Sequence, residues 1–265
     1  WGKNLARNFY NLGVLKTLCD ANEKLLDSFP YEGVHFTGNY LSMLQDKSIE
    51  QVVIATPAIT HFKLAKEALL HGKDVFVEKP ICMTVREGQE LVALAEETGR
   101  ILMVGHILQY HGAVVKLEAM VKAGELGKLQ YILSNRLNLG AFRTEENALW
   151  NFAPHDISVI LSLTGALPQE VRCTGGAYIS KGIADMTMTT MTFEGDLRAH
   201  IHVSWLHPFK EQKLIVIGSL GMAVFDDTKP WNEKLFVIKN HVRWSQGFSP
   251  EVNAENAHMI PLQEE

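Results

Sequence analysis

Apolar and polar positions recur with two different periods along the chain, and the dominant period changes near residue 125. Before this point, short β-branched or aromatic runs predict strands, and segments with apolar residues three or four positions apart predict helices. The predicted strands are 15–19, 51–55, 74–77 and 101–104, and the predicted helices are 22–28, 59–71, 85–98 and 113–123. This alternation indicates a parallel sheet with helices on both faces, as in a Rossmann-type doubly wound α/β domain over residues 1–125.

Helix ends in this part carry their own local signals. Thr84 and Glu87 form a Thr-x-x-Glu pattern that predicts a capping box at the start of helix 85–98. Gly72, Gly99 and Gly124 follow the last apolar turns of three helices, where glycine commonly ends a helix. These signals support the helices independently of the apolar spacing.

After Lys128, long alternating segments predict strands joined by short turns. They are 129–139, 170–178, 186–193, 198–205, 212–217 and 235–237, with hairpin turns at Gly195-Asp196 and 218–221. The one helix predicted among them, from Asp156 to Leu163, can cover only part of a sheet face. We therefore expect residues 126–265 to form a second domain on an open, mainly antiparallel sheet, part of which associates with another copy of the chain.

The first residues enter a helix directly. Trp1-Gly2-Lys3-Asn4 leads into an amphipathic segment with Leu5, Phe9 and Leu12 as its apolar stripe, and no apolar strand precedes it. A doubly wound domain opens with a strand and a Gly-x-Gly-x-x-Gly turn, whose glycines let the backbone approach a pyrophosphate at a helix N-terminus. We expect Gly2 to be the third glycine of that turn, with the first strand and the first two glycines outside the given residues.

Asp20 ends the second strand of such a domain, roughly 20 residues beyond the glycine turn. A carboxylate at this place accepts hydrogen bonds from ribose hydroxyls and repels a 2′-phosphate, which favours NAD over NADP. The alternative is that Asp20 caps a helix before Ala21-Asn22-Glu23. The two roles are compatible.

Strand 74–77 is followed at once by Glu78, Lys79 and Pro80. The carboxyl ends of parallel strands form the ligand crevice of an open α/β sheet, so Lys79 is expected at a candidate active-site edge. Pro80 biases Lys79 toward extended backbone, and X-Pro bonds are the usual place for cis peptides, so the lysine can be aimed rigidly. The alternative is a strand end with a solvated lysine and a turn proline.

Four segments resemble one protein family. They are Ala55-Thr56-Pro57 with His61, Val77 to Pro80, Val104-Gly105-His106, and Trp150 to Asp156, and they are similar to the Gfo/Idh/MocA oxidoreductases. The block from Arg143 to Asp156 resembles the bacterial branch that oxidises UDP-linked N-acetylhexosamines or their uronic acids at the sugar C3. The resemblance covers nearly the whole chain. It implies a dinucleotide-binding domain followed by an open antiparallel sheet that carries the substrate and the oligomer contact.

The resemblance also implies roles for individual residues. Lys79 matches the lysine that hydrogen-bonds the reacting hydroxyl, and His155 matches the histidine opposite it. Together with Gly2 and Asp20, the residues expected to bind NAD are Trp1, Thr56, Pro57, His61, Glu78, Lys79, His106 and Trp150. The residues expected to bind substrate are Lys79, Arg143, Asn151 and His155.

His155 is the expected catalytic base. Removing hydride from an alcohol carbon needs a base for the hydroxyl proton, and histidine titrates in the right range. The alternative is that Pro154-His155-Asp156 merely begins a helix. Many relatives carry an aspartate four residues before this histidine, whereas this chain has Asn151, which can hold the ring by a hydrogen bond but cannot stabilise an imidazolium by charge. Asp156 is no simple substitute, because it lies about 100° away around the helix.

The sequence allows two roles each for Trp150 and Arg143. Trp150 is expected either to form a wall of the nicotinamide pocket or to fill the domain interface. Arg143 is expected to clamp a diphosphate or a sugar carboxylate, since guanidinium suits bidentate anion binding, with a surface-loop arginine as the alternative.

Other chemistries have weaker support. His200 and His202 lie on one strand face with His207 nearby, but no carboxylate or cysteine at useful spacing completes a metal site, so none is expected. A Ser-His-Asp hydrolase is disfavoured because the chain has no Gly-x-Ser-x-Gly elbow.

Composition limits the remaining classes. The chain has 265 residues, 46% of them hydrophobic, which is enough for two modest domains. A net charge of −5 with dispersed lysine and arginine disfavours nucleic acid as the main partner. The three cysteines are widely spaced and form no Cys-x-x-Cys pair, which fits a reducing cytoplasm. No apolar run reaches membrane-spanning length, so no membrane association is expected.

Together with these limits, the resemblance implies a cytoplasmic NAD-dependent dehydrogenase that oxidises a nucleotide-linked, N-acetylated sugar and forms a homodimer or homotetramer through its antiparallel sheet. A free-polyol dehydrogenase, acting on a substrate such as inositol, and a non-catalytic NAD-binding regulator are the alternatives. Residues 251–265 are polar and weakly patterned, and 244–247 are expected to end a strand or loop. C-terminal helices that pack back on the sheet are expected outside the given residues.

Overall fold

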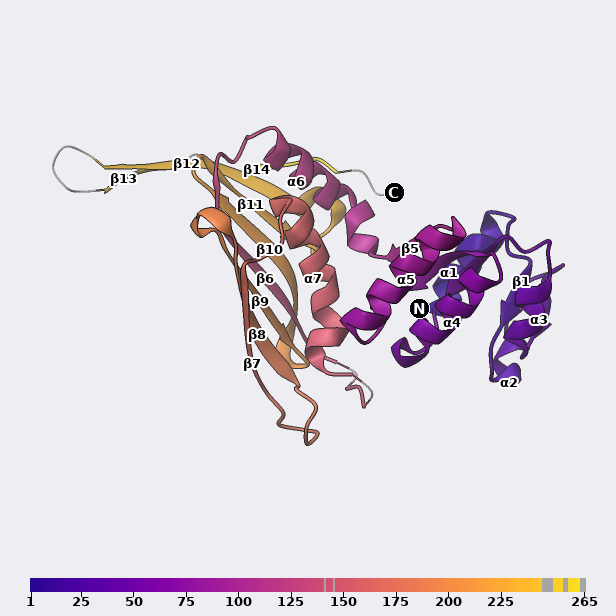
Figure 1. Ribbon diagram of the computed structural model, residues 1–265. Helices are drawn as coiled ribbons and strands as arrows, with labels where there is room; N and C mark the ends of the chain where they lie inside the picture. The colour runs from indigo at the N-terminus through magenta and orange to yellow at the C-terminus, as the bar shows by residue number, and fades with distance from the viewer. Residues whose placement is uncertain (141, 145, 245–249, 255–256, 263–265) are drawn as a thin grey trace. The chain divides into compact units, whose positions relative to one another are not determined.

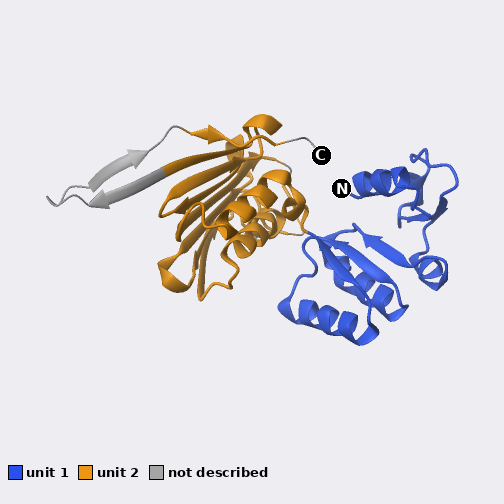
Figure 2. Cartoon of the chain, turned by 90° about the horizontal axis from the view of Figure 1, so that it is seen from above, with its two compact units in different colours: residues 1–105 blue, residues 106–265 orange. Residues whose placement is uncertain are grey.

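The structure is a computed structural model that describes residues 1–265 except 141, 145, 245–249, 255–256 and 263–265 (Figure 1). The expectation for 245–247 lies outside the described residues. The chain divides into two compact units, residues 1–105 and 106–265 (Figure 2). The division precedes the expected boundary at residue 125 because helix α6 (Gly112–Lys122) packs into the core of the second unit.

The first unit is built on parallel strands, as predicted. Its central sheet has the order β3-β4-β5, and the side chains between this sheet and helices α4 and α5 form its core. Its elements are α1 (Gly2–Asn11), β1 (Thr17–Cys19), α2 (Glu23–Leu26), β2 (His35–Thr37), α3 (Tyr40–Gln45), β3 (Gln51–Ile54), α4 (Ala58–Leu70), β4 (Asp74–Glu78), α5 (Val85–Thr98) and β5 (Leu102–Gly105).

The single sheet expected for this unit is instead two sheets. β1 pairs in parallel with β2, and no described strand joins this pair to β3. The predicted strand at 15–19 is only three residues long, and its partner His35–Thr37 has no apolar alternation that would have predicted it. Strands this short and polar are set by their pairing rather than by a local pattern.

The predicted capping box of α5 is confirmed. The Thr84 hydroxyl accepts a hydrogen bond from the Glu87 N–H at 3.2 Å, and the Glu87 carboxylate accepts one from the Thr84 N–H at 3.0 Å. Gly99 ends the helix in the left-handed conformation, with φ of 63°. The short capping motif therefore positioned the start of α5 correctly.

The second unit is a large, mainly antiparallel sheet with helices on one side. The strand order is β13-β12-β11-β10-β6-β9-β8-β7, with β14 beside β12, and among the described strand pairs of this sheet only β6–β9 is parallel. Its elements are η1 (Ile107–Tyr110), α6, β6 (Leu129–Leu139), α7 (Ala148–Thr164), β7 (Glu170–Gly176), β8 (Met186–Thr192), η2 (Glu194–Asp196), β9 (Arg198–Ser204), β10 (Leu206–Gly218), β11 (Gly221–Asp226), η3 (Trp231–Glu233), β12 (Leu235–Trp244), β13 (Pro250–Ala254) and β14 (His258–Met259). Both predicted hairpin turns, at Gly195-Asp196 and at 218–221, join neighbouring antiparallel strands.

Helix α7 begins earlier than predicted. The predicted start was Asp156, but Asn147 caps the helix by accepting a hydrogen bond from the Trp150 N–H at 3.0 Å, and Pro154 lies inside the helix. Proline in a helix removes one backbone hydrogen bond but does not always end the helix, and here packing of α7 on β6, β8 and β9 maintains it. His155 is therefore an interior helical residue, not a helix start.

Only one face of the large sheet carries α6 and α7, which lie on the same side of it (Figure 1). Buried residues such as Ile132, Ala199 and Val216 point toward these helices. Residues that alternate with them point to the opposite face and are only half-buried: Tyr131, Leu133, Ile215, Ile217, Met222 and Val224. No helix among the described residues is long and apolar enough to cross a membrane.

Candidate active site

The carboxyl ends of the three central strands bring predicted site residues of the first unit together. Ile54 pairs with Val77, and Val77 pairs with Val104, so the segments that follow these strands leave the sheet at one edge. Thr56 and Pro57 follow β3, Glu78 and Lys79 lie at and after the end of β4, and His106 directly follows β5. The structure thus confirms the edge location expected for Lys79.

His61 ties two of these segments together. It is 1% exposed, and its ring nitrogens lie 2.7 Å from the Pro80 carbonyl oxygen and 2.8 Å from the Thr56 carbonyl oxygen. The structure gives His61 a bridging role beneath the edge, and its place in cofactor binding stays a prediction.

The contact between His61 and Pro80 holds the segment that follows Lys79. The Lys79–Pro80 bond is cis, and the Pro80 carbonyl oxygen contacts His61. Lys79 itself is half-buried, so its long side chain starts from a fixed backbone and retains access to solvent.

Glu78 occupies a partly desolvated position at the same edge. Burial raises the pKa of this carboxyl, and hydrogen bonds from the Lys79 N–H and the Trp1 side chain, together with the charges of Lys79 and His61, oppose the rise. A Cβ at Gly105 would lie 3.2 Å from the Glu78 carboxyl carbon and 3.1 Å from the Phe76 ring. Glycine at position 105 therefore leaves the space that the Glu78 carboxyl fills.

The surroundings of this edge fit a dinucleotide. A Cβ at Gly2 would lie 3.5 Å from the Ala55 Cβ, so the N-terminus of α1 lies beside the end of β3. Free N–H groups at a helix start bind phosphate. Asp20 follows β1 with an exposed carboxylate, one oxygen of which accepts a hydrogen bond from the Asn22 N–H at 2.8 Å. Asp20 thus caps a turn rather than a helix, because the N-cap of α2 is Asn22.

In the second unit, α7 carries the predicted base and its neighbours. His155 is half-buried in the second turn of the helix. Asn151, one turn earlier, donates from Nδ2 to Glu146 Oε1 at 2.8 Å and accepts from the Trp205 indole at 3.4 Å. Asn151 thus connects the first turn of α7 to a carboxylate and to the core.

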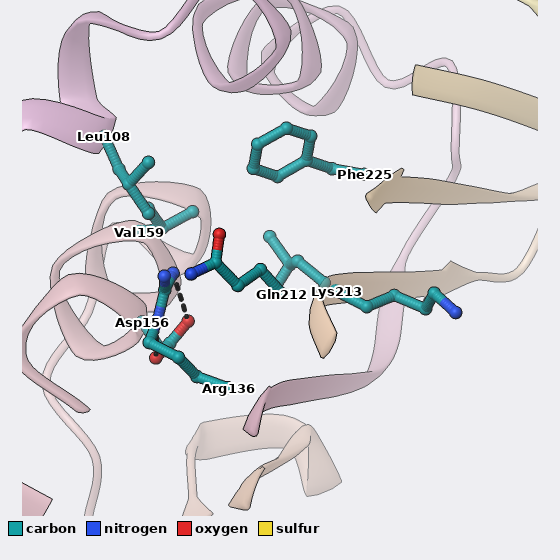
Figure 3. A pocket seen from close by; sticks show the side chains of 8 residues that line it. Leu108, Arg136, Asp156, Val159, Gln212, Lys213 and Phe225 are labelled. Carbon is teal, nitrogen blue, oxygen red and sulfur yellow. Dashed lines mark hydrogen bonds and ion pairs between the residues drawn. The ribbon is translucent and has the colours of Figure 1, made fainter. Parts of the chain in front are cut away.

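Asp156 faces the sheet and forms a buried ion pair that the sequence reasoning missed. Arg136 Nε and Nη2 donate to its two oxygens at 3.0 and 3.1 Å, and the Ser134 hydroxyl donates to Oδ1 at 2.8 Å. Figure 3 shows Arg136 and Asp156 pointing toward one another beside a hollow lined by Leu108, Val159 and Phe225. The sequence did contain a signal for this pair, because Arg136 occupies a core-facing position of an alternating strand. A buried arginine requires an acidic partner.

The other predicted residues are placed but not tested. Arg143 is exposed in the segment before α7, and the side chain of Trp150 is 37% exposed. Lys79 belongs to the first unit and His155 to the second. Their roles, and those of Arg143, Trp150 and His106, stay predictions.

The histidines of β9 and β10 form no metal centre in the described part of the chain. Burial lowers the pKa of His202, and the nearby charge of His207 adds to this. The His200 ring instead contacts the Thr190 hydroxyl at 3.1 Å and the Tyr131 ring at 5.3 Å between centroids.

Two family models match the chain in succession. The model described as "Oxidoreductase family, NAD-binding Rossmann fold" matches residues 4–106, and the "GFO/IDH/MocA C-terminal domain" model matches residues 114–224. The chain belongs to the Gfo/Idh/MocA oxidoreductase family. The family and the fold class predicted from the sequence are confirmed.

Relatives within the Gfo/Idh/MocA family carry different activities at similar identity. UDP-N-acetylglucosamine 3-dehydrogenase of Acidithiobacillus ferrooxidans is 32% identical over 157 residues, 59% of this chain and 49% of that protein. The scyllo-inositol 2-dehydrogenase (NAD(+)) of Bacillus subtilis is 27% identical over 190 residues, 68% of this chain and 56% of that protein. The 2,7-anhydro-N-acetylneuraminate hydratase of Mediterraneibacter gnavus is 26% identical over 194 residues, 68% of this chain and 52% of that protein. These similarities show the family and do not select a substrate.

A solved structure agrees with the fold. The crystal structure of a putative oxidoreductase from Magnetospirillum magnetotacticum MS-1 has a TM-score of 0.84 and 27% identity, and the match covers 100% of this chain and 84% of that one. This chain spans only 52–65% of the length of several curated relatives that it matches. The activity of the whole protein is therefore a matter for proposal.

Proposed function

We propose that this Gfo/Idh/MocA chain is an NAD-dependent dehydrogenase that oxidises a secondary hydroxyl, at the sugar C3, of a UDP-linked N-acetylhexosamine or its uronic acid. The observation that carries the proposal is the constrained lysine at the edge of the parallel sheet. Lys79 follows β4, and its neighbour Pro80 is bridged by His61 to Thr56. A fixed donor at the crevice of a dinucleotide-binding sheet suits positioning of a reacting hydroxyl.

Lys79 and His155 have separate roles in the proposed reaction. Lys79 donates a hydrogen bond to the reacting hydroxyl and favours negative charge on its oxygen as the proton leaves. His155 accepts that proton as general base. The carbon–hydrogen bond breaks with both electrons leaving as hydride, and the carbonyl double bond forms. NAD, when bound, supplies the hydride acceptor.

The cofactor role is assigned to the edge of the first unit. We assign the pyrophosphate to the N-terminus of α1 at Gly2 and the ribose to Asp20, which favours NAD over NADP. The remaining proposed contacts are Trp1, Thr56, Pro57, His61, Glu78, Lys79, His106 and Trp150. Exposure of Thr56, Pro57 and Asp20 leaves these side chains accessible to a ligand.

The substrate role is assigned to groups around α7. Arg143 suits a diphosphate or a sugar carboxylate, and Asn151 and His155 share one helix face. The 32% identical UDP-N-acetylglucosamine 3-dehydrogenase supports a nucleotide sugar. The 27% identical scyllo-inositol 2-dehydrogenase supports a second candidate, a free polyol.

The open face of the large sheet is the proposed oligomer contact. Half-buried apolar side chains of β6, β10 and β11 lie on the face opposite α6 and α7. An apolar sheet face of this kind is stabilised when a second copy covers it. We assign a homodimer or homotetramer to this face.

Reduced-nicotinamide absorbance tests the function. The protein is mixed with NAD and a panel of UDP-N-acetylhexosamines, their uronic acids and free polyols. Turnover confined to UDP-sugars and lost in Lys79→Ala supports the proposal, and turnover of polyols alone supports the second candidate. NAD binding without turnover of any panel member would instead favour the non-catalytic regulator.

A further inference from the structure

We propose that Glu146 supplies the negative charge that supports His155, and that Asn151 holds the Glu146 carboxylate in place. The catalytic meaning of this inference rests on the proposed function, in which His155 is the base. The contacts that carry it lie within the second unit and do not depend on the substrate.

Two contacts fix the orientation of the Asn151 side-chain amide. The Trp205 indole nitrogen is only a donor, so it faces Oδ1, and an ionised carboxylate is only an acceptor, so Glu146 faces Nδ2. Trp205 is 1% exposed and is part of the core, which makes it a fixed anchor. The amide therefore presents its N–H groups to Glu146.

Asn151, which binds this carboxylate, lies one helical turn before His155 on α7. The two residues are four apart, and such pairs lie on one helix face with Cβ atoms about 5–6 Å apart. Helical side chains point back toward the N-terminus, so the His155 side chain extends over the turn that carries Asn151. Glu146 also precedes the N-cap Asn147, where the helix dipole favours an anion.

The other charged or titratable groups around α7 have different partners or positions. β9 presents only Ala199, Ile201 and Val203 to the helix, none of them titratable. Other described groups around α7 include Asp156, which pairs with Arg136, and Asp185, which accepts hydrogen bonds from the Tyr178 and Ile179 N–H groups. Glu118 of α6 accepts a hydrogen bond from Ser162, His106 and Tyr110 lie around η1, and Arg143 is exposed in the segment before the helix. Among the described carboxylates, Glu146 is the one bound to the turn preceding His155.

Glu146 and Asn151 together can stabilise a protonated His155, which Asn151 cannot do alone. An amide has no charge with which to stabilise the imidazolium that forms when His155 accepts a proton. The Glu146 carboxylate, which accepts a hydrogen bond from the Asn151 amide, adds that charge at the turn preceding His155. Glu146 is thus a positioning and electrostatic residue acting on His155, not a group assigned to touch substrate.

The test is an NMR titration of the full chain labelled with ¹³C and ¹⁵N in histidine. His155→Gln identifies the His155 signal among the 11 histidines. Glu146→Gln is expected to lower the pKa of His155 by about half a unit to one unit, because it removes an opposite charge. The exchange variant, Glu146→Gln with Asn151→Asp, keeps the wild-type net charge and is expected to restore the pKa. Glu194→Gln, exposed in the distant η2 turn, removes an equal charge as a control and is expected to leave the pKa unchanged.

Kinetics give a second readout on any substrate that turns over. A base works in its neutral form, so the acid limb of the kcat/KM profile is expected to move to lower pH in Glu146→Gln by the same amount as the NMR titration. An unchanged His155 pKa in Glu146→Gln would overturn the inference, and so would an equal fall in the control Glu194→Gln. A shifted pKa without turnover of any sugar would leave this inference standing and count against the proposed function.

Discussion

Removing one partner of the buried Arg136–Asp156 pair is expected to destabilise the second unit strongly. Asp156 is 4% exposed and Arg136 is 9% exposed, with two N–H···O contacts of 3.0 and 3.1 Å between them. Asp156→Ala leaves the guanidinium buried without its carboxylate, which costs about 3–5 kcal/mol of unfolding free energy. Arg136→Met combined with Asp156→Leu removes both desolvation penalties and is expected to recover most of that loss.

Urea unfolding followed by circular dichroism and tryptophan fluorescence measures this difference. For an m-value of about 2 kcal/mol/M, Asp156→Ala is expected to lower the midpoint of the second unit by about 1.5–2.5 M. The two units can unfold separately, so the transition that exposes buried Trp205 is the one to compare. Ser134→Ala removes one 2.8 Å hydrogen bond to Asp156 and is expected to cost about 1 kcal/mol. A double variant no more stable than Asp156→Ala would refute the reasoning, because the loss would then not come from an uncompensated charge.

Three other predictions concern the sheet edge and the open sheet face. Burial raises the pKa of Glu78, so its ionisation costs stability as pH rises above the ordinary value of 4.5. Glu78→Gln is therefore expected to raise the thermal midpoint of the first unit at pH 8 and to change it little at pH 4, and a lower midpoint at pH 8 would contradict this. His61→Ala removes both contacts to the Thr56 and Pro80 carbonyls, and we expect roughly 2–4 kcal/mol of destabilisation and weaker NAD binding by calorimetry. Full NAD affinity in the folded His61→Ala variant would show that the bridge does not shape the cofactor edge. If the open sheet face is the proposed oligomer contact, Leu133→Lys is expected to lower the mass measured by light scattering from that of the wild-type assembly to that of a monomer, and an unchanged oligomeric mass would place the contact elsewhere.

The sequence was most informative where one local rule decides the structure. The run 74–77 and the Glu-Lys-Pro residues after it predicted that Lys79 lies where the carboxyl ends of the parallel strands meet. This prediction was possible because short apolar strands that alternate with helices run in the same direction. The Thr84–Glu87 box fixed the start of α5 for the same reason, since four residues contain all the groups that cap the helix.

Features decided by distant residues were not predictable in this way. Pro154 suggested a helix start, yet packing on three strands maintains α7 through it. The Arg136–Asp156 pair joins residues from β6 and α7, and sequence spacing does not reveal which acid faces which arginine. The division of the first unit into two sheets depends on the pairing of β1 with β2, and neither strand is long enough to carry a pattern.

Each predicted catalytic residue is supported by a network confined to its own unit. The segment of Lys79 is held through His61, Pro80 and Thr56, all in the first unit. The helix of His155 is attached to the sheet through Asp156 and to the core through Asn151, both in the second unit. A reacting group held by its local fold loses little entropy when substrate binds, so each network suits the role proposed for its residue. Damage to one network is therefore expected to lower the thermal midpoint of its own unit and to reduce any turnover.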